Sequence, residues 1–400
     1  MIFPIPHSGR HSAIMRDRTR PVALHLIDHL DLGGAQSQLL DLCTGLRERG
    51  FEPVVCALRV SRIWPERFRE AGIPLYQLRG GRLSPLKLLH LRRLANENRI
   101  DLIHAHLTGA TIAGGMLAGW CDRPLIIHDH SGQEQAIITR PPLTGLLRFL
   151  ERRAMGRAAA LIAVSSRVAS HHLARGTLPA ERIHTIPNWI ATDRFRYDDR
   201  WRHGWRRRWM IDETTPVIGF VGRLHPVKRV HLLLEAMPRL VAEAPRPPLL
   251  VVAGEGEEAS ALERLANRLG IASRVRFVSP SCHTCELYSA FDLLALPSRY
   301  ETFGLVLLEG MASGLPVVST DTGAARELLA GEAPHRLVQV DDPALLTSAL
   351  LETIRQLPLP AVTGERPALL PPAFDGATSL REMSRLYRRL LAGQASPKIA

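Results

Sequence analysis

Short apolar runs alternate with helical segments along the chain, and they fall into two series. Runs typical of buried strands span residues 22–27, 53–58, 100–105, 125–128 and 161–164 in the first series. Those of the second series span residues 217–221, 249–253, 275–278, 293–296 and 316–319. Strands that alternate with helices form parallel sheets covered by helices. The pattern therefore predicts an α/β fold with two Rossmann-like, doubly wound domains facing across a cleft, with ligands at the carboxyl ends of the strands.

A length of 400 residues agrees with two domains, because it exceeds what one core usually holds. We expect an N-terminal domain over 21–190, an interdomain junction over 191–215 and a C-terminal domain over 216–378. An amphipathic helix within 379–400 either caps the second domain or crosses back onto the first. Residues 1–20 contain four arginines but no apolar stretch of a secretory signal, so we interpret them as a disordered leader.

Positive charge is concentrated in the first half of the chain. Residues 1–210 hold 32 Lys and Arg against 18 Asp and Glu, whereas residues 211–400 hold 19 against 21, within a net charge of +12. This asymmetry predicts that the N-terminal domain faces something anionic: nucleic acid, a membrane leaflet or a phosphorylated acceptor. With 5% aromatic residues and no nucleic-acid-binding motif, we expect no nucleic-acid partner. Five scattered cysteines and the lack of a bilayer-spanning apolar stretch predict a cytoplasmic protein, able to associate peripherally with the inner face of the cell membrane.

A pair of carboxylates is the strongest functional signal. Glu301 and Glu309 bracket an apolar run opened by Phe303 and Gly304. We predict a helix over about 303–313, whose N-terminal amides and dipole suit a phosphate. Carboxylates on either side of that phosphate can accept hydrogen bonds from hydroxyls, which matches the layout of a nucleotide-sugar. The alternative is that these are two solvated glutamates on a core helix.

Other residues at predicted strand ends suit the same ligand. Gly33 and Gly34 follow the first strand, where glycines allow backbone to approach a diphosphate. Arg223 and Lys228 follow the first strand of the second series and suit a diphosphate. The guanidinium of Arg223 could donate two parallel hydrogen bonds to it, and the ammonium of Lys228 could act as a compact positive charge. Lys228 is one of only three lysines beside 48 arginines, which suggests that arginine would not serve there.

Four histidines end two strands of the first series: His104, His106, His128 and His130. Zinc held by these four is an alternative to a role beside the ligand, and Cys282 with Cys285 is a second candidate zinc pair. The cysteines have no second Cys/His pair at a fitting distance. We expect no metal at either place.

Taken in order, these motifs resemble the retaining GT-B glycosyltransferases of family 4, from about residue 22 to residue 391. The segment containing Pro187 and Asn188, followed by Asp193, Arg194 and Phe195, is similar to the family's interdomain segment. The resemblance implies transfer of a sugar from a nucleotide-diphosphate sugar to a glycan or lipid-linked acceptor, with retention of anomeric configuration. It implies a UDP-sugar first and a GDP-sugar second, with no cofactor, in envelope or extracellular polysaccharide or glycolipid biosynthesis.

The resemblance also implies a role for each matching residue. Glu309 would hold the ribose hydroxyls and Glu301 the transferred sugar, while Arg223 and Lys228 would stabilise the leaving diphosphate. His130 matches the family's active-site histidine, with His128 as the rival assignment, and His106 and His128 are expected on the acceptor side. The remaining expected donor contacts are Gly33, Gly34, Gly254, Phe277, Val278, Phe303, Gly304 and Leu305.

Three alternatives remain open at this level. A sugar-nucleotide epimerase or hydrolase of similar fold would turn over the donor without an acceptor, and a non-catalytic protein would only bind it. Basic amphipathic helices expected over 143–157 and 86–94 could lie on an anionic leaflet. They could equally be ordinary surface helices.

Overall fold

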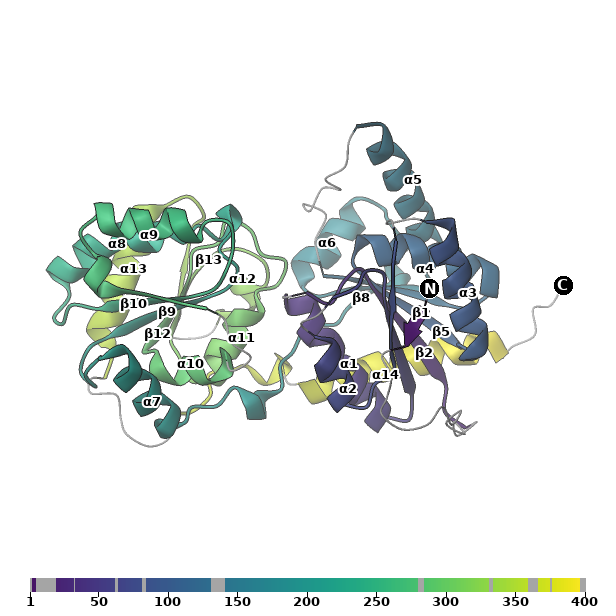
Figure 1. Cartoon of the computed structure of the whole chain (residues 1–400), viewed down its shortest axis with the longest axis horizontal. Helices are drawn as coiled ribbons and strands as arrows, with labels where there is room; N and C mark the ends of the chain where they lie inside the picture. Colours follow the sequence, from purple (N-terminus) through teal and green to yellow (C-terminus); the bar gives the residue numbers. More distant parts are fainter. Residues whose placement is uncertain are drawn as a thin grey trace. The chain divides into compact units, whose positions relative to one another are not determined.

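The computed structural model describes residues 2–4, 19–31, 33–61, 64–80, 84–130, 141–279, 284–330, 334–358, 366–374 and 376–395. They form two compact units, one of residues 1–188 with 376–400 and one of residues 189–375. Each unit is built on one sheet that is parallel except at β1 (Figure 1). The predicted α/β fold with two Rossmann-like sheets is therefore confirmed. No helix among the described residues has both the length and the apolar composition needed to cross a bilayer.

The first unit contains an eight-stranded sheet with the order β1-β4-β3-β2-β5-β6-β7-β8. Its strands are β1 (Ile2–Pro4), β2 (Val22–Ile27), β3 (Glu52–Ala57), β4 (Leu75–Leu78), β5 (Leu102–His106), β6 (Leu125–Asp129), β7 (Ala160–Ala163) and β8 (Ile183–Thr185). Every residue of β2, β5, β6 and β7 is buried, as expected when helices cover both faces of a parallel sheet. The expectation of a disordered leader is wrong for Ile2–Pro4, because β1 pairs antiparallel with β4. Residues 1 and 5–18 lie outside the described residues.

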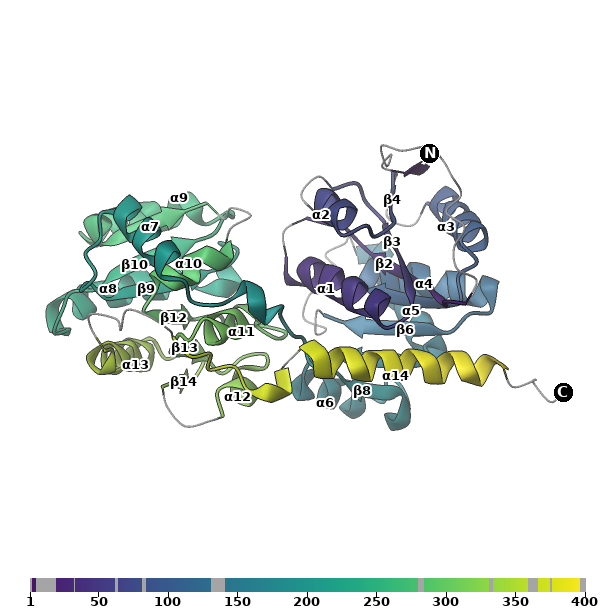
Figure 2. The same cartoon turned by 90° about the horizontal axis from the view of Figure 1, so that it is seen from below.

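Helices of the first unit are α1 (Gly34–Glu48), α2 (Pro65–Glu70), α3 (Pro85–Glu97), α4 (Thr108–Cys121), α5 (Pro141–Arg157), α6 (Ser166–Ala174) and α14 (Gly376–Ala395). Helices α3, α4 and α5 pack in succession, and α1 packs with α14 (Figures 1 and 2). Helix α14 therefore joins the unit that begins the chain. Leu380 packs so closely on α1 that a Cβ at Gly45 would lie 2.4 Å from its Cδ1. Tyr387 contacts Phe51 edge to face, and its hydroxyl lies 2.6 Å from His104 Nδ1.

The second unit contains a six-stranded parallel sheet with the order β11-β10-β9-β12-β13-β14. Its strands are β9 (Val217–Val221), β10 (Leu249–Ala253), β11 (Val275–Val278), β12 (Leu293–Leu296), β13 (Val317–Thr320) and β14 (Arg336–Val338). Its helices are α7 (Asp199–Trp209), α8 (His231–Glu243), α9 (Ala259–Arg268), α10 (Thr284–Ala290), α11 (Leu305–Ala312), α12 (Ala325–Leu328) and α13 (Pro343–Gln356). Short 3-10 turns of the two units cover Ala180–Arg182, Thr192–Arg194, Pro226–Lys228, Ala272–Arg274 and Pro372–Phe374.

Strand order reverses beside β2 in the first sheet and beside β9 in the second. In doubly wound sheets, ligands bind at such switch points.

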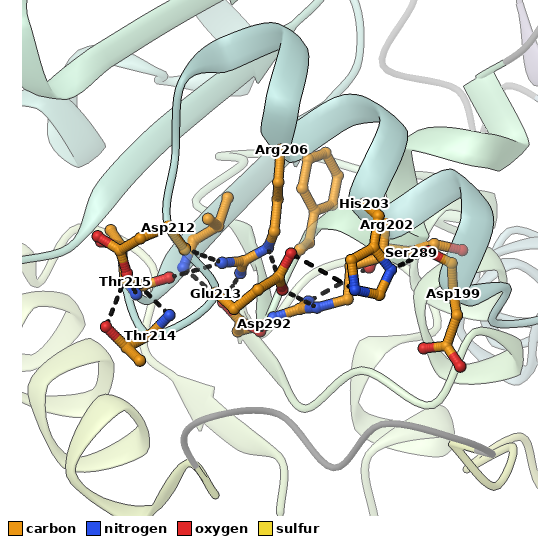
Figure 3. A network of polar contacts seen from close by, with 12 residues as sticks. Asp199, Arg202, His203, Arg206, Asp212, Glu213, Thr214, Thr215, Ser289 and Asp292 are labelled. Atoms are coloured by element: carbon orange, nitrogen blue, oxygen red, sulfur yellow. Dashed lines mark hydrogen bonds and ion pairs between the residues drawn. The ribbon is translucent and has the colours of Figure 1, made fainter.

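Helix α7 occupies much of the segment interpreted from sequence as a junction without a clear period. Its inward face carries Arg202 and Arg206, whose side chains are 2% and 1% exposed, beside the buried Trp209. Asp292 pairs with both, at 3.1 Å from Arg202 Nη2 and 2.5 Å from Arg206 Nη2, and it also accepts from the amide of Val217 (Figure 3). The network anchors α7 to the amino-terminal ends of β9 and β12. The two arginines lie among the partly buried tryptophans of the helix, so charged residues occupy buried positions and its amphipathic pattern was not recognisable.

Replacing Asp292 with alanine should lower the free energy of unfolding of the second unit by about 3–5 kcal/mol, because two buried guanidinium groups lose their buried counter-charge and keep only the half-exposed Glu213. Equilibrium urea denaturation would measure the change. As a control, Glu243→Ala breaks the exposed pair of Arg239 and Glu243 and should leave the transition nearly unchanged. Equal effects of the two substitutions would contradict the role given to the network.

Candidate functional site

Glycines bring together the loops that follow β9 and β10. A Cβ at Gly254 would lie 1.9 Å from the carbonyl oxygen of Gly222, so only glycine allows this approach. Gly222 N donates to Ala253 O at 3.0 Å, and Leu224 N donates to Glu255 O at 2.8 Å. Gly254, an expected donor contact, thus has a packing role that fixes the loop carrying Arg223. The Arg223 side chain is exposed at this edge.

Lys228 and Glu301 meet at the carboxyl edge of the second sheet. Lys228 ends the 3-10 turn after β9, Glu301 follows β12, and Lys228 Nζ lies 2.5 Å from Glu301 Oε1. Their side chains are 18% and 11% exposed. Ser298 Oγ donates to the same carboxylate oxygen at 2.7 Å, and Arg299 N donates to Val227 O at 2.8 Å. The loops on both sides of the switch point are therefore joined by an ion pair and by backbone.

Helix α11 begins at Leu305, two residues later than the sequence predicted. Gly304 precedes it with φ 95°, in the left-handed region that favours glycine. Phe303 lies outside the helix, because its side chain is 3% exposed and its carbonyl accepts from Ala324 N at 3.0 Å. A Cβ at Gly323 would lie 2.8 Å from that carbonyl oxygen. The buried aromatic side chain and this tertiary contact explain why the helix starts later.

Glu309 lies in the second turn of α11 and is partly exposed. Its carboxylate accepts a hydrogen bond from the hydroxyl of Tyr288 on α10. Burial, together with the charge of Glu309, raises the pKa of Tyr288 well above its usual value, so the phenol remains a donor at neutral pH. Tyr288 and Ser298 position the two predicted carboxylates, and sequence reasoning missed both. No local pattern marks them, because each contact is made between separate elements.

Phe277 and Val278, the expected contacts to the base, end β11 at this same edge. They pair in register with Val252 and Ala253 of β10, and both are partly exposed. Gly254 N donates to Val278 O at 2.9 Å. Among the donor-side residues that the sequence predicted in the second unit, Lys228 and Glu301 are in direct contact, and Phe277 and Val278 lie at the same carboxyl edge of the sheet.

The first unit places its own predicted residues at the carboxyl edge of its sheet. Gly33 caps α1 in extended backbone and Gly34 is the first residue of that helix, both exposed. His106 of β5 pairs in register with His128 of β6, and His130 follows β6. His104 lies two residues earlier on β5, where its Nδ1 contacts the hydroxyl of Tyr387 and its ring lies 4.2 Å from that of His106, centroid to centroid. Cys282 lies outside the described residues, so the structure does not describe its pairing with Cys285.

The histidines form a larger cluster than the sequence predicted, because His25 of β2 belongs to it. His130 Nε2 lies 3.0 Å from His106 Nδ1, and His106 Nε2 lies 3.2 Å from His25 Nδ1. Burial lowers the pKa of His25 to about 3 and that of His130 to about 4. It also lowers the pKa values of His104, His106 and His128 well below 6.5, so all five rings are neutral near pH 7. His25 pairs in register with His104 on the neighbouring strand. Knowledge of the strand order would therefore have indicated that His25 belongs to the histidine cluster.

Substituting Gly254 with alanine should destabilise the second unit by about 1–3 kcal/mol, because the new Cβ overlaps the backbone of Gly222. It should also displace the loop of Arg223. The matched control is Gly204→Ala in α7, where no atom lies within 4 Å of an added Cβ. That substitution should stabilise the helix by about 0.5–1 kcal/mol. Urea denaturation of the two variants would test the expected opposite signs.

Two family models match the chain, one in each unit. Residues 215–356 match the model described as "Glycosyl transferases group 1", and residues 32–194 match "Glycosyltransferase Family 4". The D-inositol 3-phosphate glycosyltransferase of Corynebacterium jeikeium is 35% identical over 217 residues, which are 52% of each chain. The D-inositol 3-phosphate glycosyltransferase 2 of Catenulispora acidiphila is 29% identical over 371 residues, 85% of this chain and 86% of that protein.

Several of these curated relatives match over only about half of their own length. In fold, the chain is similar to the crystal structure of Anabaena Alr3699/HepE in complex with UDP and glucose, with a TM-score of 0.77. That alignment covers 92% of this chain and 100% of the other at 22% identity, which is evidence of a shared fold. The predicted fold is thereby confirmed as the GT-B type. In sequence, the chain is similar to the group 1 glycosyltransferases over residues 215–356 and to family 4 over residues 32–194.

Proposed function

We propose that the protein transfers a sugar from a nucleotide-diphosphate sugar to a glycan or lipid-linked acceptor, with retention of anomeric configuration. The observation that carries this proposal is the pairing of Lys228 with Glu301 at the switch point of the second sheet, directly before the N-terminus of α11. A cation, a carboxylate and free helix amides at one place match the diphosphate and the sugar hydroxyls of such a donor.

In this proposal the donor diphosphate lies between Lys228, Arg223 and the first amides of α11. Lys228 is paired with Glu301 in the structure, so a bound diphosphate would compete for its ammonium group. Glu301 would then accept hydrogen bonds from hydroxyls of the transferred sugar. Glu309, oriented by Tyr288, would accept from the ribose hydroxyls. Backbone at Phe277 and Val278 would contact the base.

The reaction breaks the bond between the anomeric carbon and the terminal phosphate oxygen of the donor. Negative charge then develops on the leaving diphosphate, where Lys228 and Arg223 stabilise it. The acceptor hydroxyl forms the new bond on the face that the diphosphate leaves, and its proton passes to the leaving phosphate oxygen. Retention of configuration follows from attack on that face. These protein cations supply the charge stabilisation, so the step is proposed without a metal cofactor.

The first unit contributes residues whose roles rest on the family resemblance. His130 is assigned beside the donor sugar, Gly33 and Gly34 to the diphosphate, and His106 to the acceptor side. His130 is partly exposed, whereas His128 is 1% exposed, which favours His130 over its neighbour as the ring that meets substrate.

A uridine nucleotide is the first choice of donor and a guanosine nucleotide the second. Solved structures of the fold relative Anabaena Alr3699/HepE contain UDP with glucose and UDP-glucose, which supports a UDP-sugar. Relatives named for D-inositol 3-phosphate support an acceptor with negative charge, in agreement with the basic first half of this chain. A place in envelope or extracellular glycan biosynthesis remains our proposal.

Peripheral binding to an anionic leaflet is a further part of the proposal. Helix α5 exposes Leu146 and Phe149 next to Arg148, Arg152 and Arg153. Helix α3 exposes Leu86 and Leu89. Exposed apolar side chains among arginines are typical of helices that lie on membranes.

One residue expected on that surface does not belong to it. Lys87 of α3 is 3% exposed, and its ammonium group donates to Leu58 O at 2.5 Å. It therefore serves the interior of the first unit, and the prediction that it contributes to a basic helix face is wrong. The proposed membrane surface depends on the arginines of α5.

UDP-glucose, a GDP-sugar and an ADP-sugar should be compared by thermal shift on the wild type and on Glu309→Ala. One donor should raise the melting temperature of the wild type, because a ligand at one hundred times its Kd stabilises the folded state by about 2.7 kcal/mol. The same donor should have much less effect on the melting temperature of the variant. Glu263→Ala on the exposed side of α9 serves as the control and should respond like the wild type. A folded wild type that responds to none of the three donors would contradict the donor site.

Donor turnover with and without an acceptor mixture distinguishes the alternative functions. We expect slow release of the nucleoside diphosphate from the donor alone and faster release with acceptor, both lowered about 100–1,000-fold in Lys228→Met through loss of charge stabilisation. Coupled UDP detection and NMR of the sugar would measure the release. Release at the same rate with and without acceptor would support a hydrolase. A new sugar epimer with intact nucleotide would instead support an epimerase. Tight donor binding with no turnover, even with acceptor mixtures, would support a non-catalytic binding protein.

Flotation with vesicles containing an anionic phospholipid tests membrane association. The wild type should float at low salt, and Arg148→Glu/Arg152→Glu/Arg153→Glu should lose most of this binding, because each basic residue contributes about 1 kcal/mol. Arg207→Glu/Arg208→Glu on the exposed face of α7 is the charge-reversal control in the other unit. Failure of the wild type to float at low salt would refute this part of the proposal.

A further inference from the structure

We propose that His106, His128 and His130 form a binding site for a divalent transition-metal ion, with Zn²⁺ as the reference case. From the sequence, zinc at His104, His106, His128 and His130 was an alternative, and we expected no metal. In the structure each of these residues offers one ring nitrogen, and the three nitrogens lie within 4.8 Å of one another. The inference is independent of sugar transfer.

The backbone holds the three rings at close range. His106 and His128 are register neighbours on adjacent parallel strands, and His130 lies two residues beyond His128 on the same face. The His128 and His130 rings stack with centroids 4.0 Å apart, and His106 Nδ1 lies 3.0 Å from His130 Nε2. Tetrahedral zinc with bonds of about 2.0–2.1 Å places its nitrogen ligands about 3.4 Å apart. Small side-chain rotations would therefore complete the site.

His128 supplies the observation that most clearly indicates a ligand. Its side chain is 1% exposed, and neither ring nitrogen has a hydrogen-bond partner among the described residues. A buried polar group without a partner is unfavourable, and most in native structures are satisfied. A metal ion bound to one of these nitrogens would use its lone pair.

The other nitrogen of His106 completes the arrangement expected around a metal ligand. His106 Nε2 lies 3.2 Å from His25 Nδ1, so with the metal on Nδ1 its Nε2–H would donate to His25. Histidine ligands usually donate their second nitrogen in this way, which fixes the tautomer and the ring plane. This gives a positioning role to His25, which sequence reasoning missed.

The donor set favours a particular class of metal. Neutral imidazoles suit zinc, copper, nickel and cobalt, whereas magnesium and calcium prefer oxygen ligands. The adjacent carboxylate, Asp129, is engaged by His172 Nε2 at 2.8 Å. Three imidazoles would therefore leave a fourth coordination position open.

Metal binding would also affect the proposed transfer reaction, and this consequence rests on the proposed function. An ion on His130 would withdraw its ring from the donor sugar, so Zn²⁺ should inhibit turnover and a chelator should restore it. The binding experiment does not require activity. Failure of the metal site and failure of the transferase proposal are thus distinguishable.

Chelator-treated full-length protein should be equilibrated with ZnCl₂, dialysed and analysed for metal by mass spectrometry. We expect one zinc ion per chain, and X-ray absorption should show nitrogen ligands at about 2.0–2.1 Å. His130→Asn should weaken zinc binding at least tenfold. This residue is partly exposed, so its substitution is the least disruptive of the three, and thermal melting would verify that the variant folds.

Three further variants serve as controls. His104→Asn tests the neighbouring group of His25, His104 and His106, whose ring nitrogens are also close together. His203→Asn removes an exposed histidine of α7, and Cys285→Ser removes the possible cysteine ligand. All three should retain zinc. No zinc in the wild type, retention by His130→Asn with loss in His104→Asn, or sulfur ligands at about 2.3 Å would each overturn the proposal.

Discussion

Strand order reverses beside β2 in the first sheet and beside β9 in the second, and the rest of the molecule depends on this constraint. Beside β9, the loops that follow β9 and β12 run in opposite directions across the sheet, which leaves space at its carboxyl edge. Lys228 and Glu301 approach that space from the two loops. The same reversal beside β2 brings β5 next to β2, so that three histidine-bearing strands lie side by side. Both candidate sites are consequences of topology.

Support within each site comes from elements distant in sequence. Glu309 is oriented by Tyr288 of α10, Glu301 by Ser298, and the Phe303 carbonyl by Ala324 after β13. Such contacts restrict the rotamers of the carboxylates before any ligand binds. On the opposite edge of the same sheet, Asp292 holds α7 through two arginines. The second unit therefore separates a ligand-facing carboxyl edge from an amino edge stabilised by buried ion pairs.

The sequence predicted ten of the strands, because burial of a strand is a local signal, but it did not predict β1, β4, β8 or β14. The roles of the donor-side residues stay predictions. The sequence predictions failed where tertiary contacts override local pattern. Helix α7 was missed because Arg202 and Arg206 occupy its buried face, and α11 starts late because Phe303 is drawn into the core. Lys87 appeared basic and exposed, yet its amine is buried against a carbonyl. His25 carries no motif, and only the strand order brings it beside His106.

Helix α14 has a consequence for how the protein forms. It packs on α1 and brings Tyr387 to His104. Residues 1–188 of the same unit and the whole second unit precede it in the chain. During synthesis on the ribosome, the face of the first unit that α14 covers therefore stays uncovered until α14 has emerged. Leu380 and Tyr387 complete the core of the first unit by contacting Gly45 and His104, which lie far earlier in the chain. Contacts of such high sequence separation form slowly. The first unit is thus begun early and completed late, and until α14 packs on it the unit keeps apolar surface exposed, a property of folding intermediates that favours aggregation.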